Sequence, residues 1–180
     1  MTPDFIPQFL SRAEALEPRA LAAVRDLSPG QLAARPPAGG WSIAEIFEHL
    51  CLTSESYDPV LARAFERARA RSDTPRPVRG TFMGTLLRKA LMESNRQSMP
   101  APRVWVPLAP RERVVESFLL RVRGSMARLR EAEGLDTRVM LASPAAWFLR
   151  MNLAEALALE VVHAERHLGQ IERVRASLAR

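Results

Sequence analysis

A stripe of apolar residues at helical spacing in the first third of the chain predicts a long amphipathic helix. It begins at Ile43 and continues through Ile46, Phe47 and Leu50 as far as Phe65. Residues three and four apart lie on one face of an α-helix, so this face must be buried against other elements. The rest of the chain must therefore supply elements that cover it.

Residue pairs typical of helix starts indicate where two long helices begin. Ser42 and Glu45 have the spacing of a capping box, in which each side chain binds the backbone amide of the other residue. Asn152 and Glu155 repeat this spacing near the C-terminus. Good helix formers dominate the rest of the chain, and alternating β-branched runs that would indicate strands are few. We predict helices over 4–26 (kinked at Pro18), 28–34, 42–71, 82–92, 111–133 and 152–178.

Proline-rich stretches separate these helices. The longest connection, residues 94–110, contains four prolines and joins the second long helix to the third. Four long helices with one long connection predict an all-α four-helix bundle with a crossover, whose ligand sites are built from inward-facing side chains. No repeat or domain boundary is evident, so residues 1–180 are predicted to form a single domain.

Composition narrows the functional classes. The chain has no run of about 18 apolar residues, which excludes a membrane span, and its N-terminal segment does not resemble a secretory signal. A single cysteine, Cys51, fits a reducing cytoplasm. The net charge of +6 invites a nucleic-acid interpretation, but the arginines alternate with acidic residues along the helices. That pattern is usual for a solvated helix face, so we expect no specific nucleic-acid binding.

The three histidines of the chain are the strongest chemical signal. His163 and His167 are four residues apart on the last predicted helix, so both imidazoles lie on one face and can reach one metal ion at about 2.0–2.1 Å. All three lie at the edge of their helix's apolar stripe, His49 on the second long helix. A third histidine from a facing helix would complete a three-ligand set with an open position, as catalytic metal sites have.

The alternative hypothesis is that these histidines have a structural role and bind no metal. A histidine that flanks an apolar face is more often a hydrogen-bonded core residue than a ligand, and an HxxxH pair alone is a weak signal. The pair is also not the zincin motif, because Ala164 follows the first histidine where that motif has glutamate. Peptidase chemistry is therefore not indicated.

Two segments resemble one known family. Residues 40–50, GWSIAEIFEHL, resemble the start of the second helix in the DinB/YfiT-like superfamily, and residues 163–171, HAERHLGQI, resemble its last-helix motif. With the helix order, the resemblance covers nearly the whole chain, although residues 72–145 carry no motif of this family that we identify.

The resemblance implies a four-helix bundle with up-down-down-up topology and a divalent ion, zinc or nickel among those found, on three histidines. By position the ligands would be His49, His163 and His167. The resemblance also implies frequent homodimers and, in some branches, thiol transferases that use bacillithiol, mycothiol or related low-molecular-weight thiols.

Several other side chains near the histidines have candidate roles. Glu160, one turn before His163, falls within the apolar stripe. It is a candidate for orienting an imidazole or for proton transfer, and equally for a salt bridge to an arginine of a neighbouring helix. Glu48 points away from the stripe, and Cys51 is about 200° from His49 around the helix, so neither is expected to be a ligand. Gln170 belongs to the last-helix motif, and structural hydrogen bonding is its default role. The aromatic residues Trp41, Trp105, Trp147 and Phe148 are expected to pack or to form pocket walls.

Two hypotheses from different classes follow. The first is a divalent-metal-dependent enzyme, a transferase that uses a small thiol or a metal-assisted hydrolase, acting on a small molecule. The alternative is a non-catalytic bundle that binds a partner or a stress ligand, with a structural metal or none. The discriminating feature is the fourth coordination position, which is open and reached by solvent in the first case.

Overall fold

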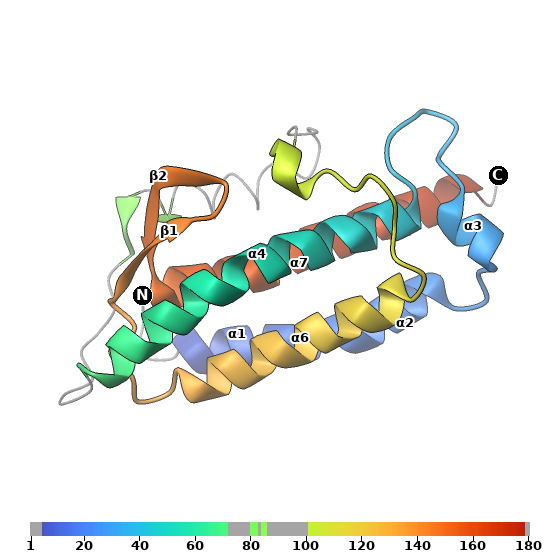
Figure 1. Cartoon of the computed structure of the whole chain (residues 1–180). Helices are drawn as coiled ribbons and strands as arrows, with labels where there is room; N and C mark the ends of the chain where they lie inside the picture. Colours follow the sequence, from blue (N-terminus) through green and yellow to red (C-terminus); the bar gives the residue numbers. More distant parts are fainter. Residues whose placement is uncertain (1–4, 72–79, 83, 86–100, 179–180) are drawn as a thin grey trace.

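The computed structural model describes residues 5–71, 80–82, 84–85 and 101–178 (Figure 1). This part of the chain is mostly helical, and its long helices lie side by side (Figure 1). The elements are α1 (Phe5–Glu14), α2 (Leu16–Val24), α3 (Pro29–Ala33), α4 (Ile43–Arg69), the 3₁₀ turn η2 (Arg103–Trp105), α6 (Val114–Glu131), β1 (Met140–Ser143), β2 (Ala146–Asn152) and α7 (Leu153–Leu178).

The two capping boxes predicted from the sequence are present. The Ser42 hydroxyl accepts a hydrogen bond from the Glu45 amide at 3.2 Å, and the Glu45 carboxylate accepts one from the Ser42 amide at 2.7 Å. Asn152 and Glu155 make the same reciprocal pair at 2.9 and 3.0 Å. These bonds satisfy amide groups that a helix start leaves without partners, and they fix where α4 and α7 begin.

The first predicted helix is divided into α1 and α2, and the break lies at Ala15 rather than at Pro18. A proline cannot donate to the carbonyl four residues earlier and its ring clashes there, so Pro18 disturbs the helix near Glu14. The short helix after Ser28 forms as predicted, with Ser28 as its capping residue. The helix predicted over 82–92 lies for the most part outside the described residues.

The expectation that the chain has no strands is wrong between α6 and α7. β1 and β2 form an antiparallel hairpin in which Leu141 pairs with Met151 and Ala142 with Arg150. Val139, Leu141 and Met151 are buried, so the hairpin is anchored on the bundle by one apolar side. Periodicity missed it because the strands are short and their apolar residues do not alternate strictly.

The core lies between the long helices. The stripe of α4 is buried as predicted, with Ile43, Ile46 and Phe47 fully enclosed, and it packs against α6 and α7. From α7, Leu157, Leu168 and Ile171 are also fully buried. Within the described residues, no helix is both long and apolar enough to cross a membrane.

Candidate metal centre

The packing of α4 against α7 brings the three histidines together. His49 lies two turns into α4 and is 3% exposed, while His163 and His167 face it from α7. The ring centroid of His49 lies 5.1 Å from that of His163 and 4.8 Å from that of His167. The centroids of the two α7 histidines are 4.5 Å apart. One nitrogen from each imidazole lies within 4.8 Å of the other two.

Two of the imidazoles have their orientation fixed by hydrogen bonds at Nδ1. His49 Nδ1 lies 2.8 Å from the main-chain oxygen of Trp105, and His167 Nδ1 lies 2.9 Å from Oε1 of Gln170. Both partners are acceptors, so each Nδ1 carries the proton and donates it. Nε2 of His49 and Nε2 of His167 therefore carry the lone pairs that a metal ion would bind, and in this structure Nε2 of His49 makes a hydrogen bond with Nε2 of His163 at 3.2 Å.

The histidine geometry fits a divalent ion. Two nitrogens bound tetrahedrally to one zinc ion at about 2.1 Å lie about 3.4 Å apart. His49 Nε2 and His163 Nε2 are 3.2 Å apart, close to that separation. Among the described residues, no further histidine, cysteine or carboxylate joins the group. The cluster would thus offer three neutral nitrogen ligands to an ion and would leave at least one coordination position open.

The electrostatic environment keeps the imidazoles neutral. Burial lowers the pKa of His49, with the Trp105 carbonyl opposing and the charge of Arg166 adding to the shift. Burial and the neighbouring histidines hold the pKa of His163 well below its ordinary value. Burial, His49 and Arg166 together lower the pKa of His167 to about 3. Neutral imidazole is the form that binds metals, so no proton competes at neutral pH.

The cluster lies in the wall of a cavity of about 800 Å³. Trp41 and Trp105 line this cavity, as expected for pocket walls, and the Trp41 ring lies 5.0 Å from the His49 ring. Trp147 and Phe148 on β2 are 82% and 60% exposed, so the expectation that they pack or line the pocket is wrong. These two residues lie near the start of β2, close to the hairpin turn.

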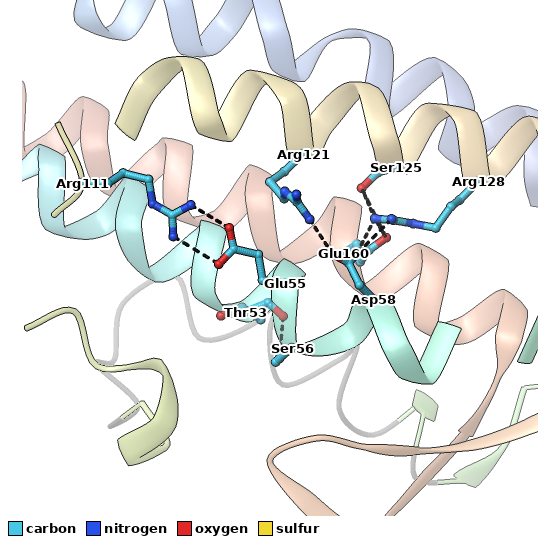
Figure 2. Close-up of polar contacts among 9 residues, drawn as sticks. All are labelled: Thr53, Glu55, Ser56, Asp58, Arg111, Arg121, Ser125, Arg128 and Glu160. Carbon is cyan, nitrogen blue, oxygen red and sulfur yellow. Dashed lines mark hydrogen bonds and ion pairs between the residues drawn. The ribbon is translucent and has the colours of Figure 1, made fainter. Parts of the chain in front are cut away.

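Glu160 also lines the cavity, but its carboxylate is held by α6 (Figure 2). Arg128 donates to it at 2.9 and 3.2 Å, and Ser125 donates at 3.2 Å. The predicted alternative of a salt bridge to a neighbouring helix is therefore present. Burial raises the pKa of Glu160, and the charge and hydrogen bond of Arg128 oppose that shift.

Asp58 of α4 extends this network along α6. It accepts from Arg121 at 2.6 Å and from Arg128 at 3.2 Å, so two arginines and two carboxylates alternate between α4, α6 and α7 (Figure 2). The four charges balance one another.

The remaining candidates are placed away from the cluster. Cys51 is buried, its Sγ faces the main-chain oxygen of Val114, and burial raises the pKa of its thiol to about 12. Glu48 also points away from the histidines, but it is buried, because Arg111 covers it from the segment before α6.

Sequence reasoning missed the group that orients His49, and it gave Gln170 a hydrogen-bonding role without naming His167 as the partner. The acceptor for His49 is a main-chain carbonyl in η2, and no residue type indicates such a role. Trp105 itself is fixed against α4, where its indole nitrogen donates to Ser56 at 2.9 Å and its ring stacks on Tyr57. The acceptor for His167 had a usable signal, because Gln170 follows at i+3 and residues at that spacing meet on a helix.

Comparison with known protein families assigns most of the chain to one superfamily. The model of the DinB superfamily matches residues 12–171, which includes both histidine segments and the middle of the chain. No curated protein and no solved structure matches the chain.

Proposed function

The chain belongs to the DinB superfamily, and from this premise we propose that it is a divalent-metal-dependent enzyme acting on a small molecule. His49, His163 and His167 are the proposed ligands. The observation that carries the proposal is the three-nitrogen cluster in the wall of a cavity of about 800 Å³, with no fourth protein ligand among the described residues. Three neutral imidazoles suit zinc or nickel, so these are the proposed metals.

A bound ion of this kind supplies Lewis acidity, which stabilises a thiolate or hydroxide at neutral pH. The chain's own residues hold and orient the imidazoles, keep them neutral, and provide a partly apolar cavity for the substrate. The proposed reaction is the transfer of a low-molecular-weight thiol to an electrophile, with metal-assisted hydrolysis as the second candidate. The thiol must come from a cosubstrate, because Cys51 is buried with its pKa raised to about 12.

Glu160 is a secondary element of the proposal. It lies in the cavity wall, and burial raises its pKa above the ordinary value, the direction that a proton-transfer role requires. Its bonds to Arg128 and Ser125 favour a structural role instead. A Glu160→Gln variant separates the two: proton transfer predicts a changed pH–rate profile, whereas a structural role predicts lower stability with an unchanged profile.

The proposal also includes the up-down-down-up bundle topology, a homodimer, a cytoplasmic location and no specific nucleic-acid partner. The resemblance supports the topology and the dimer, and the long connection between α4 and α6 fits that topology. The single cysteine favours the cytoplasm. Several exposed arginines pair with acidic residues, as Arg19 does with Glu172, which supports the absence of a nucleic-acid role.

The first experiment measures metal content. Protein purified without added metal, and again after zinc or nickel is supplied, should carry close to one ion per chain and lose it on chelation. A His163→Ala/His167→Ala double variant should carry none, and Arg113→Gln, a change at an exposed surface pair, should behave as wild type. Wild-type protein that holds no metal after zinc or nickel is supplied would refute the proposal.

The second experiment tests for catalysis against the non-catalytic alternative. Metal-loaded protein is assayed with bacillithiol, mycothiol and glutathione against 1-chloro-2,4-dinitrobenzene, and with nitrophenyl esters for hydrolysis. Turnover that disappears on chelation and in the histidine double variant supports an enzyme. Full metal occupancy without turnover across the panel favours the bundle that binds a ligand without chemistry.

A further inference from the structure

The cavity continues past the histidines towards the β-hairpin. Ser54 follows His49 on α4, and Glu160 precedes His163 on α7. Because the two helices run in opposite directions, Ser54 and Glu160 lie on the same side of the histidines (Figure 1). At about 1.5 Å per residue they are about 7.5 Å and about 4.5 Å further along the bundle, towards the end where β2 leads into α7. Both residues line the same cavity as the histidines.

Polar residues in this part of the cavity occupy positions where apolar side chains are expected. Ser54 of α4, Ser125 of α6 and Glu160 of α7 each stand within the buried stripe of their helix. The neighbours three, four or seven positions away in these stripes are buried and apolar: Leu50 and Leu61, Val122 and Leu129, Leu157 and Ala164. Tyr57 and Ser143 line the cavity as well, and we call these five polar residues the polar end.

Ser54 is the member of the polar end whose hydrogen bonds are not accounted for. Glu160 accepts from Arg128 and from Ser125, so its place in the stripe is explained by protein contacts. The Oγ of Ser54 is enclosed and has no hydrogen-bond partner among the described residues, and the same holds for Nε of Arg128. A buried hydroxyl without a partner costs stability, so its position in the middle of an apolar stripe points to a ligand group that binds it.

The surroundings favour a neutral group in this place. The four charges of the network between α4, α6 and α7 balance one another, so a further buried charge would lack a counter-ion (Figure 2). A hydroxyl group both donates and accepts hydrogen bonds. It can accept from Ser54, and the Tyr57 oxygen one turn further along α4 can accept from it. The hydrogen of Tyr57 is already donated to Ser143 at 2.9 Å, so this oxygen is left as an acceptor.

We propose that Ser54 and Tyr57 form a hydroxyl-binding subsite, and that the cavity takes a small neutral alcohol with an apolar or aromatic body. The body extends along Leu50 and Phe118 to the histidine end, where Trp41 lies against His49. A volume of about 800 Å³ lies within the range of cavities that enclose small organic ligands. That this alcohol is the substrate rests on the proposed function; the recognition of the hydroxyl does not.

The test uses two probes that differ only in a hydroxyl group, para-fluorobenzyl alcohol and para-fluorotoluene. Fluorine NMR titration gives their affinities in chelator-treated protein, where no metal ion binds the hydroxyl, and again with one equivalent of zinc. In both states Ser54→Ala should weaken binding of the alcohol by about two- to tenfold, the loss that corresponds to one neutral hydrogen bond. Binding of the hydrocarbon should change by less than about twofold, because the substitution removes no contact with it.

Two further variants act as controls. Ser117→Ala changes a serine of α6 that does not line the cavity, and it should leave both affinities unchanged. The His163→Ala/His167→Ala double variant shows whether the hydroxyl binds at the histidine end instead. Failure of the alcohol to bind the wild-type protein, or equal changes for both probes in Ser54→Ala, would overturn the subsite. A loss of alcohol affinity in the histidine variant but not in Ser54→Ala would overturn it as well.

Thermal unfolding separates recognition of a ligand from a role in the fold. Ser54→Ala removes an enclosed hydroxyl that has no partner among the described residues, so the ligand-free variant should melt at or above the temperature of the wild type. A Tm lower by more than about 4 °C, with both probe affinities unchanged, would assign the hydroxyl to the fold and refute the proposal.

The outcome is separable from that of the proposed function. Hydroxyl-selective binding in protein that takes up no metal would support the subsite and refute the metal enzyme. Full metal occupancy without hydroxyl-selective binding would do the reverse.

Discussion

Arg111 lies in the segment that precedes α6, and its side chain binds Glu48 and Glu55 of α4. Replacing Arg111 tests whether these contacts support the candidate metal centre. Its Nε and Nη2 donate to Glu48 at 2.9 and 2.8 Å, its main-chain amide donates to the same carboxylate at 3.0 Å, and Nη1 and Nη2 bind Glu55 at 2.6 and 3.1 Å. Burial alone would raise the pKa of Glu48, but the hydrogen bonds and charge of Arg111 bring it below the ordinary value. We predict that Arg111→Met destabilises the protein and weakens metal binding together.

The size of the loss follows from these contacts. Arg111→Met removes two side-chain hydrogen bonds to a Glu48 carboxylate whose side chain is 7% exposed, and it keeps the main-chain bond. A hydrogen bond to a charged group contributes about 1.5–3 kcal/mol, so the two sum to about 3–6 kcal/mol before solvent screening. The Arg111 side chain is 33% exposed, and screening reduces the estimate to about 2–3 kcal/mol. For a chain of this length that corresponds to a fall in Tm of about 4–12 °C.

Thermal unfolding followed by circular dichroism measures this fall, with Arg113→Gln as the matched control. Arg113 pairs with Glu116 at 77% and 55% side-chain exposure, and such a pair contributes at most about 0.5 kcal/mol. A double variant with Glu48→Gln should recover part of the loss, because a neutral amide needs no cation. If Arg111→Met melts within about 2 °C of the control, the substitution changes the free energy of unfolding by less than about 1 kcal/mol. The argument from the burial of Glu48 is then wrong.

Three further predictions concern the ligands and the acid stability of the fold. His163→Ala and His167→Ala should weaken metal binding at least as much as His49→Ala, because either change breaks the pair of histidines that α7 preorganises. Competition with a chelator measures the affinity of each variant. Near-native affinity in either pair variant would contradict the prediction. Gln170→Leu should lower metal affinity by about 10–100-fold, since His167 loses its acceptor, and an unchanged chelator titration would show that the hydrogen bond is incidental. Asp136 accepts hydrogen bonds from Arg138 that hold the pKa of its carboxyl below the ordinary value. The ionised carboxylate therefore stabilises the fold above about pH 4, and this stabilisation is lost as the pH falls through the pKa in the folded protein. Asp136→Asn should therefore reduce Tm at pH 7, and this reduction should become smaller as the pH falls below about 4. A reduction that stays the same size as acid is added would exclude this linkage.

The sequence allowed the helices and the histidine cluster to be predicted because both depend on local periodicity. Ser42 and Asn152 marked the starts of α4 and α7 correctly, since a capping box involves residues three positions apart. The spacing of His163 and His167 placed them on one face of α7. His49 comes close to this pair once the buried stripes of α4 and α7 pack together.

Features that depend on contacts between distant segments could not be predicted in this way. The hairpin forms because Leu141 and Met151 find an apolar surface on the bundle, and no local pattern shows that surface. Burial of Glu48 depends on Arg111, a residue 63 positions away. The orientation of His49 depends on a main-chain oxygen 56 positions away, which belongs to the backbone and not to a side chain.

The two groups that accept hydrogen bonds from His49 and His167 differ in how well they tolerate substitution. The acceptor for His167 is the Gln170 side chain, so most substitutions at that codon remove it. The acceptor for His49 is the carbonyl of Trp105, and every amino acid has a main-chain carbonyl. A saturation mutagenesis scan should find position 170 intolerant even of polar replacements that lack an acceptor at that reach. Position 105 should instead accept residues that keep the 3₁₀ turn against α4, so sequence drift at that position can proceed without loss of the His49 hydrogen bond.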